Sequence, residues 1–207
     1  MKLVIFDCDG TLVDSELLCN LALEHQLSEL GVKYAAEELL SKYRGRKFDS
    51  IITSLETELS MTFPESFELE YRLKVSDLFD KELVANDGVK DVLESLTIPC
   101  CVASSAPRSK VEQALRVTDL SKFFGNNIFS SYEIGSWKPE PQLFLHAANV
   151  MNVEPKNCLV VEDSLPGLQA AHKAKMKSIY YAPAATKPSQ IADVQIKHMS
   201  ELVKYIT

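Results

Sequence analysis

Short apolar runs alternate along the chain with longer segments whose apolar residues recur at helical spacing. Each run stops at or near polar residues, which is typical of strands buried on both faces. The predicted strands are residues 3–6, 100–103, 128–129, 159–161 and 179–181. Helical stripes are found at residues 89–96, 111–115, 143–151 and 168–174. Strands and helices in alternation predict a parallel sheet that helices cover on both faces.

One stretch, from about residue 15 to residue 82, breaks this rhythm. It shows no strand-like run, and its apolar residues fit helices near residues 17–30, 51–59 and 67–79, with breaks at Gly31 and Pro64. A block of roughly 65 residues can bury a small core of its own. We therefore expect an α/β core of residues 1–14 and 83–207, and an all-helical domain of residues 15–82 inserted after the first strand.

Composition and charge exclude several classes of protein. The 207 residues are 46% apolar and 25% charged, which is ordinary for a globular protein. The 29 acidic and 22 basic residues give a net charge of −7, without the basic patch of a nucleic-acid binder. No apolar run approaches the roughly 20 residues that span a bilayer, and the two acids among the first nine residues argue against a signal peptide. We expect a cytoplasmic monomer or weak homodimer, with no nucleic-acid or membrane partner.

The cysteines agree with a reducing compartment. They are odd in number, form no C-x-x-C pair, and lie mostly in apolar segments, where a free cysteine behaves as a small hydrophobic residue. A catalytic cysteine or a zinc site is the alternative, but the four histidines show no ligand spacing. We predict buried, reduced thiols at Cys8, Cys19, Cys100, Cys101 and Cys158.

The residues that end the predicted strands are polar, and several are acidic. Asp7 and Asp9 follow the first strand, Ser104 follows the second, and Glu162 and Asp163 follow the fourth. The carboxyl ends of parallel strands share one edge of a sheet, which is where ligands of such folds bind. Carboxylates gathered there suit Mg²⁺ and repel one another without a cation. The alternative is that the first pair belongs to a turn and the second to a helix cap.

Four motifs in order resemble the haloacid dehalogenase-like phosphatase superfamily. The segment D-C-D-G-T-L-V-D-S-E, which begins at Asp7, is similar to the first motif, D-x-D-G-T/V after a strand. The others are matched by C-V-A-S-S at Ser104, W-K-P-E-P at Lys138 and V-V-E-D-S at Glu162. A helical cap directly after the first motif resembles the subgroup that contains phosphoglycolate phosphatase and β-phosphoglucomutase. The resemblance covers nearly the whole chain and implies a Rossmann-like α/β fold with an inserted all-helical cap.

Carried over residue by residue, the resemblance implies a role for each motif. Asp7 is the nucleophile that becomes an aspartyl-phosphate, and Asp9 is the general acid and base. Ser104 donates a hydrogen bond to a phosphoryl oxygen, and Lys138 stabilises the charge beside Asp7. The alternatives are a helix cap at Ser104 and a solvated lysine at Lys138. The implied Mg²⁺ ligands are Asp7, Asp9 through its backbone carbonyl, Asp163, and Glu162 close by or through a water.

Candidate substrate-binding residues lie near the first two motifs and in the cap. Thr11 shapes the loop after Asp9, and Ser105 follows Ser104. The most basic stretch of the chain lies between two predicted cap helices, and related enzymes carry a glycine and basic residues there that reach the substrate. A solvated charge run is the alternative. The stretch consists of Arg44, Gly45, Arg46 and Lys47.

Two departures from the family pattern bear on the reaction. Many relatives, including the mutase, carry a histidine shortly after the first motif, where this chain has L-L-C-N at residues 17–20; hydrolysis is therefore favoured over isomerisation. The residues after Ser104 read S-A-P in place of the common asparagine and glycine, so we expect no side-chain amide contact to phosphate there. A further resemblance, which rests on D-C-D-G-T together with Cys19, is to bacterial phosphatases of the 6-phosphogluconate type.

These features predict an Mg²⁺-dependent phosphatase that hydrolyses a small phosphorylated metabolite, a sugar phosphate or a phosphorylated sugar acid, through an aspartyl-phosphate. A hexose-phosphate mutase is the alternative within the family. Outside it, the alternatives are a non-catalytic phospho-acceptor that resembles a receiver domain, and a binding protein that has lost catalysis. A receiver domain lacks a helical insert of this size and carries its acceptor on a later strand. The binding protein is disfavoured because every catalytic position is filled.

Overall fold

The computed structural model describes residues 1–43, 46–184 and 189–206. The chain divides into two compact units. The first, which we call the α/β unit, comprises Met1–Asp14 and Val84–Thr207. The second, the helical unit, comprises Ser15–Leu83. Each unit has a hydrophobic core of its own.

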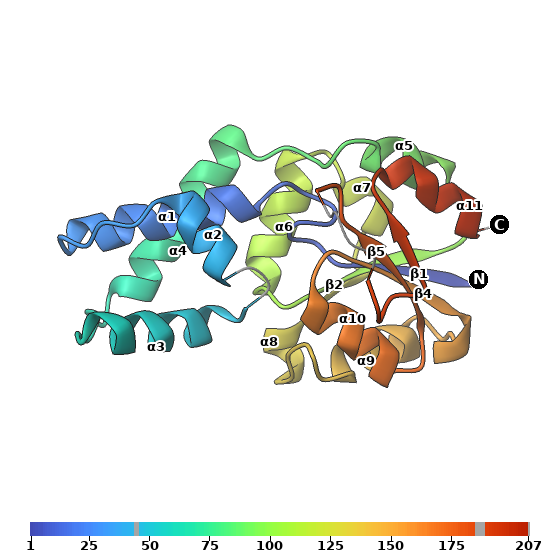
Figure 1. The fold of residues 1–207 in the computed structure, drawn as a ribbon. Helices are drawn as coiled ribbons and strands as arrows, with labels where there is room; N and C mark the ends of the chain where they lie inside the picture. Colours follow the sequence, from blue (N-terminus) through green and yellow to red (C-terminus); the bar gives the residue numbers. More distant parts are fainter. Residues whose placement is uncertain (44–45, 185–188, 207) are drawn as a thin grey trace. The chain divides into compact units, whose positions relative to one another are not determined.

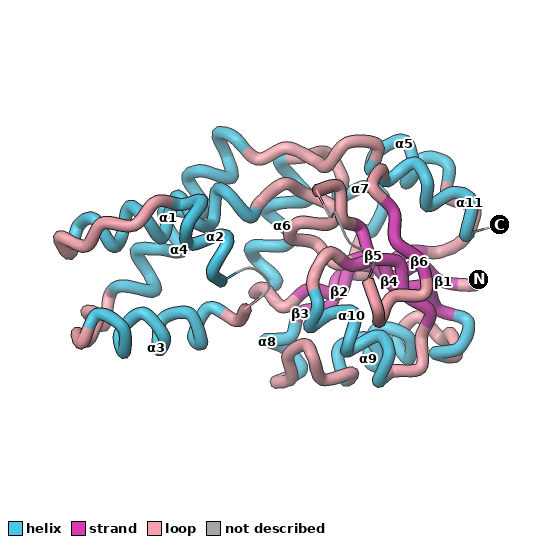
Figure 2. The backbone as a smooth tube through the Cα atoms, viewed as in Figure 1, coloured by secondary structure: helices cyan, strands magenta, loops and turns pink. Residues whose placement is uncertain are grey.

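A six-stranded parallel sheet forms the centre of the α/β unit, with its strands in the order β3-β2-β1-β4-β5-β6. Figure 2 shows the strands in magenta. The strands are β1 (Leu3–Phe6), β2 (Cys100–Ser104), β3 (Ile128–Ser130), β4 (Cys158–Glu162), β5 (Lys177–Tyr181) and β6 (Val194–Ile196). The predicted parallel sheet is thus confirmed. Because β1 lies between β2 and β4, the three strands that end at or just before candidate site residues are neighbours.

Helices cover both faces of this sheet (Figure 1). α9 (Gln142–Val150) and α10 (Leu165–Lys173) pack on one face, while α6 (Arg108–Val117) and α7 (Ser121–Phe124) pack on the other. The remaining helical segments are α5 (Val89–Ser95), α8 (Ser131–Ile134), α11 (Val203–Ile206) and the 3₁₀ turns η1 (Pro155–Asn157) and η2 (Met199–Leu202). This layering confirms the predicted α/β class.

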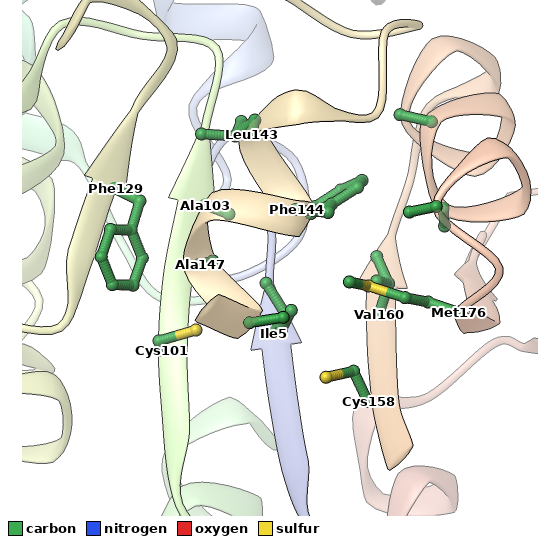
Figure 3. Close-up of a cluster of buried hydrophobic side chains, with 14 of the residues drawn as sticks. Ile5, Cys101, Ala103, Phe129, Leu143, Phe144, Ala147, Cys158, Val160 and Met176 are labelled. Carbon is green, nitrogen blue, oxygen red and sulfur yellow. The ribbon is translucent and has the colours of Figure 1, made fainter. Parts of the chain in front are cut away.

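Alternate residues of the strands form a separate core on each face. Figure 3 shows one of these cores, in which Ile5 of β1, Cys101 of β2 and Val160 of β4 lie in one cluster with Phe144 of α9. On the other face the ring of Phe6 meets that of Phe124 edge to face, with 6.2 Å between centroids. Interiors packed this closely resist displacement, so the two cores hold the carboxyl ends of the strands in place.

Burial makes most of the thiols unreactive. All five cysteines are free; Cys8, Cys101 and Cys158 are buried, while Cys19 and Cys100 are only half-buried, which corrects the prediction that all five are buried. Burial raises the pKa of the Cys100 and Cys158 thiols to about 11 and that of Cys101 well above its usual value. The thiolate is the nucleophilic form, so these three cysteines are poor nucleophiles.

The helical unit consists of helices around a compact apolar cluster. Its helices are α1 (Glu16–Glu29), α2 (Ala36–Tyr43), α3 (Phe48–Leu59) and α4 (Phe67–Glu82). Leu27, Leu39 and Leu55 are fully buried in the cluster, and the rings of Phe63 and Phe67 stack at its edge with 4.3 Å between centroids. The sequence pattern did not predict α2, whose buried face is small because the helix has only eight residues. Within the ranges that the structure describes, no helix is long and apolar enough to cross a membrane.

Candidate active site

The chain turns sharply where β1 ends. The carbonyl of Cys8 accepts hydrogen bonds from the backbone N–H groups of Thr11, Leu12 and Val13 at 3.3, 2.9 and 3.2 Å. Gly10 has a φ of +76°, a conformation that favours glycine. A side chain at this position would also overlap the carboxylate of Asp163. The turn therefore brings the first acidic motif directly against the last one.

A single lysine joins the first and fourth motifs. Lys138 Nζ lies 2.5 Å from Asp7 Oδ1 and 2.7 Å from Glu162 Oε1. The three side chains are 5%, 9% and 1% exposed, so the cluster is nearly dry. The ammonium also lies 5.0 Å from the centroid of the Phe144 ring, which belongs to the core beneath it. Sequence reasoning expected Lys138 beside Asp7, and the structure brings the two together.

Burial and charge act in opposite directions on these groups. Burial, aided by the charge of Glu162, raises the pKa of Asp7 to about 7 although Lys138 opposes the rise. Burial alone would lower the pKa of Lys138, but the charges of Asp7 and Glu162 raise it above its ordinary value. The ammonium is therefore held in its charged form. Buried charges are costly unless paired. Removal of Lys138 would therefore leave Asp7 and Glu162 buried without their common cation.

Glu162 is held from both sides. While Lys138 donates to its Oε1, its Oε2 accepts hydrogen bonds from Ser164 N at 2.6 Å and Ser164 Oγ at 2.8 Å. Ser164 is also the N-cap of α10, because its Oγ accepts from Gly167 N at 3.2 Å. A Cβ at Gly167 would overlap the Glu162 side chain. The helix cap lies at Ser164 rather than at the acid pair, and its geometry fixes Glu162 beneath Lys138.

Asp163 and Thr11 connect the two acidic loops. Thr11 Oγ1 donates to Asp163 Oδ1 at 3.0 Å, and Thr11 is fully buried. A residue that sequence reasoning missed, Asn86, supports the same loop: its Nδ2 donates to the carbonyls of Gly10 at 3.1 Å and Thr11 at 2.9 Å. Its A-N-D-G context is typical of a turn and carries no signal of this contact. Thr11 thus shapes the loop, as its position after the first motif predicts.

The donor set of these loops fits Mg²⁺. Mg²⁺ is usually held by one or two carboxylates together with waters and substrate phosphate, rather than by a cage of protein ligands alone. Asp7 directly follows β1, and the carboxylate of Asp163 lies against Gly10, which is next to Asp9 in the chain. Within the described residues, no group of three or more His, Cys, Asp or Glu side chains has the geometry of a metal site. A site with two carboxylates and one backbone carbonyl agrees with both observations.

The loop after β2 presents serine and backbone groups at the same edge. Ser104 is 1% exposed, and its Oγ accepts from Ala106 N at 3.1 Å. Ser130 Oγ donates to the Ala106 carbonyl at 2.6 Å, which fixes the loop from β3. Ser105, which is half-buried, lies between Ser104 and Ala106 in the chain. The N-cap residue of α6 is Pro107, so Ser104 does not cap that helix.

A second lysine, which sequence reasoning missed, lies beside the other aspartate of the first motif. Lys110 Nζ lies 2.9 Å from Asp9 Oδ1. It is in the first turn of α6, and no motif marks it. Only the fold reveals this pair, because the two residues are 101 positions apart in the chain.

The basic stretch belongs to the helical unit. Arg44 and Gly45 lie outside the described residues. The guanidinium of Arg46 donates to the hydroxyls of Ser50 and Ser54, each at 2.8 Å, and Lys47 pairs with Asp49. Both basic side chains therefore have partners on the first turns of α3.

The comparisons with known proteins define the class. Residues 4–181 match the haloacid dehalogenase-like hydrolases, so this chain belongs to that family. It is 37% identical over 205 residues to 6-phosphogluconate phosphatase of Escherichia coli, covering 98% of this chain and 93% of the relative. It is 31% identical over 187 residues to a phosphorylated carbohydrates phosphatase of Thermotoga maritima, covering 87% and 84%. Within the family, the chain is a phosphoric monoester hydrolase.

A solved structure agrees with this assignment. A hydrolase of the same family from Deinococcus radiodurans, with bound phosphate and sodium, superposes with a TM-score of 0.78 at 25% identity. The match covers 98% of this chain and 93% of the other.

Proposed function

We propose that the protein is an Mg²⁺-dependent phosphatase that hydrolyses a small sugar phosphate or phosphorylated sugar acid through an aspartyl-phosphate on Asp7. One observation carries this proposal: the buried ammonium of Lys138 joins Asp7 to Glu162 at the carboxyl edge of the sheet. A carboxylate is a weak nucleophile toward an anionic phosphoryl group, so it requires fixed positive charge beside it. Lys138 supplies that charge.

The reaction takes place in two steps. Asp7 attacks phosphorus, its new O–P bond forms as the ester P–O bond breaks, and Asp9 gives a proton to the departing alcohol oxygen. A water then attacks the phosphoryl group, Asp9 takes its proton, and phosphate leaves as the Asp7 carboxylate is restored. Ser104 and Ser105 supply donors to the phosphoryl oxygens, and Lys138 stabilises their charge throughout.

The metal has a defined place in this proposal. Asp7, Asp163 and the backbone carbonyl of Asp9 would hold Mg²⁺, which when bound offsets the charge of the phosphoryl oxygens. Glu162 would position Lys138: its Oε1 accepts a hydrogen bond from Lys138, and its Oε2 accepts one from Ser164. The sequence-based expectation places Glu162 close to the metal or in contact with it through a water.

Substrate choice is proposed to lie in the helical unit, which would act as the cap that the sequence predicts for residues 15–82. The basic residues Arg46 and Lys47 suit an anionic substrate, and Thr11 holds the loop beneath it. The Escherichia coli relative at 37% identity is a phosphatase of a phosphorylated sugar acid, which favours that class of substrate here. The free thiols agree with the expected cytoplasmic location.

Phosphate release tests this proposal. Purified protein is given 6-phosphogluconate, a hexose phosphate and phosphoglycolate with Mg²⁺, and free phosphate is measured over time. We expect selective release that disappears with EDTA or with Asp7→Asn, while Asp77→Asn, at an exposed position of α4, leaves it unchanged. Product analysis separates hydrolysis from a mutase, which would give an isomeric sugar phosphate. Equal release by Asp7→Asn and the parent protein would contradict the proposal.

A further inference from the structure

Each aspartate of the D-C-D motif has a lysine of its own. Lys138 holds Asp7, and Lys110 lies 2.9 Å from Asp9 Oδ1. We infer that Lys110 is a positioning residue for the reaction: its ammonium donates to Oδ1 of Asp9 and so orients the carboxyl group, whose other oxygen carries the proton that goes to the leaving group. This inference rests on the proposed function, in which Asp9 is the general acid and base.

The second pair is expected to contribute less to stability than the first. The side chains of Lys110 and Asp9 are 23% and 28% exposed, whereas Lys138 is only 5% exposed. Ion pairs that water reaches add little to stability, because solvent screens the attraction and ordering both side chains costs entropy. What such a pair can do is restrict the orientation of a short side chain. Asp9, in a tight turn after β1, is such a side chain.

The first turn of α6, from which the Lys110 side chain reaches Asp9, is itself fixed. Lys110 N donates to the Pro107 carbonyl at 3.1 Å in the first turn of α6. Arg108 anchors this turn, since its guanidinium donates to Glu133 Oε1 and to the carbonyl of Ile128, each at 2.5 Å. These contacts connect the start of α6 to α8 and β3. The ammonium is therefore presented to Asp9 from a rigid element, as a positioning group requires.

The leaving group determines how much this positioning matters. A sugar alkoxide is a poor leaving group and needs a proton from Asp9 as the ester bond breaks. p-Nitrophenolate departs without one. If Lys110 acts through Asp9, its removal slows the first step strongly for a sugar phosphate and much less for p-nitrophenyl phosphate. A loss of folding or of phosphate binding would instead affect both substrates equally.

The test compares Lys110→Met with Lys110→Arg and with Lys156→Met, a control in which an exposed ion pair of η1 is broken away from the site. Rapid mixing with each substrate, with Mg²⁺ present, follows release of the first alcohol product. For 6-phosphogluconate we expect Lys110→Met to lower the rate constant of this first step about 10- to 100-fold, with the half-saturating substrate concentration changed less than about threefold. The loss for p-nitrophenyl phosphate is at least about tenfold smaller. Lys110→Arg restores most of the rate, and Lys156→Met matches the parent protein.

Two outcomes would overturn the inference and leave the proposed function standing. In the first, Lys110→Met lowers the first-step rate equally for both substrates. In the second, it lowers the rate for neither. In both cases Asp7→Asn still abolishes phosphate release. Activity that survives Asp7→Asn would overturn the proposed function, and the inference with it. Thermal unfolding of all variants accompanies the kinetics; we expect Lys110→Met and Lys156→Met to unfold at similar temperatures.

Discussion

Lys138 in the α/β unit and Lys42 in the helical unit make contacts of the same kind and length with very different surroundings. Each lysine approaches a carboxylate to 2.5 Å. Lys138 is 5% exposed and bridges two acids, whereas Lys42 and its partner Glu58 are 40% and 41% exposed. The distance between the charges is therefore no guide to their importance. Burial is, because attraction between charges and the cost of leaving one unpaired both rise as water is excluded.

The difference also separates the two units by what their charged residues do. At the carboxyl edge of the sheet, Lys138 and Glu162 are each bonded on more than one side, so the removal of one group disturbs the others. On the helical unit the pairs are exposed and lie within or between neighbouring helices, as Arg72 and Glu68 do in α4. The charges at the sheet edge are buried and depend on one another, whereas water reaches and screens these pairs of the helical unit.

The largest effect is expected from Lys138→Met, which removes the charge and keeps most of the volume. Asp7 and Glu162 would then face each other without their shared cation. We expect phosphate release to fall about 10²- to 10³-fold, because one preorganised electrostatic group is lost. Breaking a buried pair also costs about 3–5 kcal/mol of unfolding free energy, which urea denaturation in EDTA measures.

A double variant separates the two consequences of that change. Lys138→Met with Glu162→Gln removes one of the two unpaired acids, so part of the lost stability should return while activity stays low. If Lys138→Met alone keeps its activity within about threefold, burial does not give this lysine the importance that we assign to it. A Lys138→Met protein with unchanged urea midpoint would contradict the stability argument alone.

A matched pair of glycines extends the comparison to the backbone. Gly10 and Gly31 have nearly equal φ values of +76° and +75°, but only Gly10 faces a neighbour, the carboxylate of Asp163. Alanine costs about 1 kcal/mol at either position for its left-handed conformation. Gly10→Ala must also displace Asp163, so we expect release to fall about 10²-fold and more Mg²⁺ to be needed for half-maximal rate.

Measurements of release against Mg²⁺ concentration, and of urea unfolding, test both glycine variants. Gly31→Ala, at a position with open space around it, should lose stability without any change in the Mg²⁺ requirement. Similar kinetic losses for the two variants would mean that backbone strain, and not the position of Asp163, controls the site. Equal Mg²⁺ requirements for Gly10→Ala and the parent protein would argue against Asp163 as a metal ligand.

The sheet and the convergence of Asp7, Ser104 and Glu162 could be predicted because they depend on local signals. Buried parallel strands read as continuous apolar runs, and the residue after each run falls at the same edge. The three-residue strand β6 escaped notice because V-Q-I carries a polar residue at its centre. Such a short edge strand depends on pairing with β5 more than on its own pattern.

The contacts that complete the site could not be read from the sequence in the same way. Lys110 lies on a helix whose pattern indicates only its buried face, and its partner is 101 residues away. No spacing rule connects them. Ser164 and Gly167 did leave a signal, since S-L-P-G resembles a helix start with its N-cap and an early proline. That signal predicts the cap but not that the cap residue also holds Glu162.

The smallest effect is expected from Lys42→Met in the helical unit. Glu58 accepts hydrogen bonds from Lys42 at 2.5 Å, from Tyr34 at 2.8 Å and from Tyr43 at 3.4 Å. These three bonds equal in number those that Glu162 accepts. Because water reaches both charges, it replaces the lost contact, and we expect Tm to change by no more than about 2 °C with kcat and KM unaltered. Thermal unfolding at low and high salt checks this, since salt should remove any residual difference. A loss comparable to that of Lys138→Met would show that the number of hydrogen bonds, and not burial, separates the two lysines.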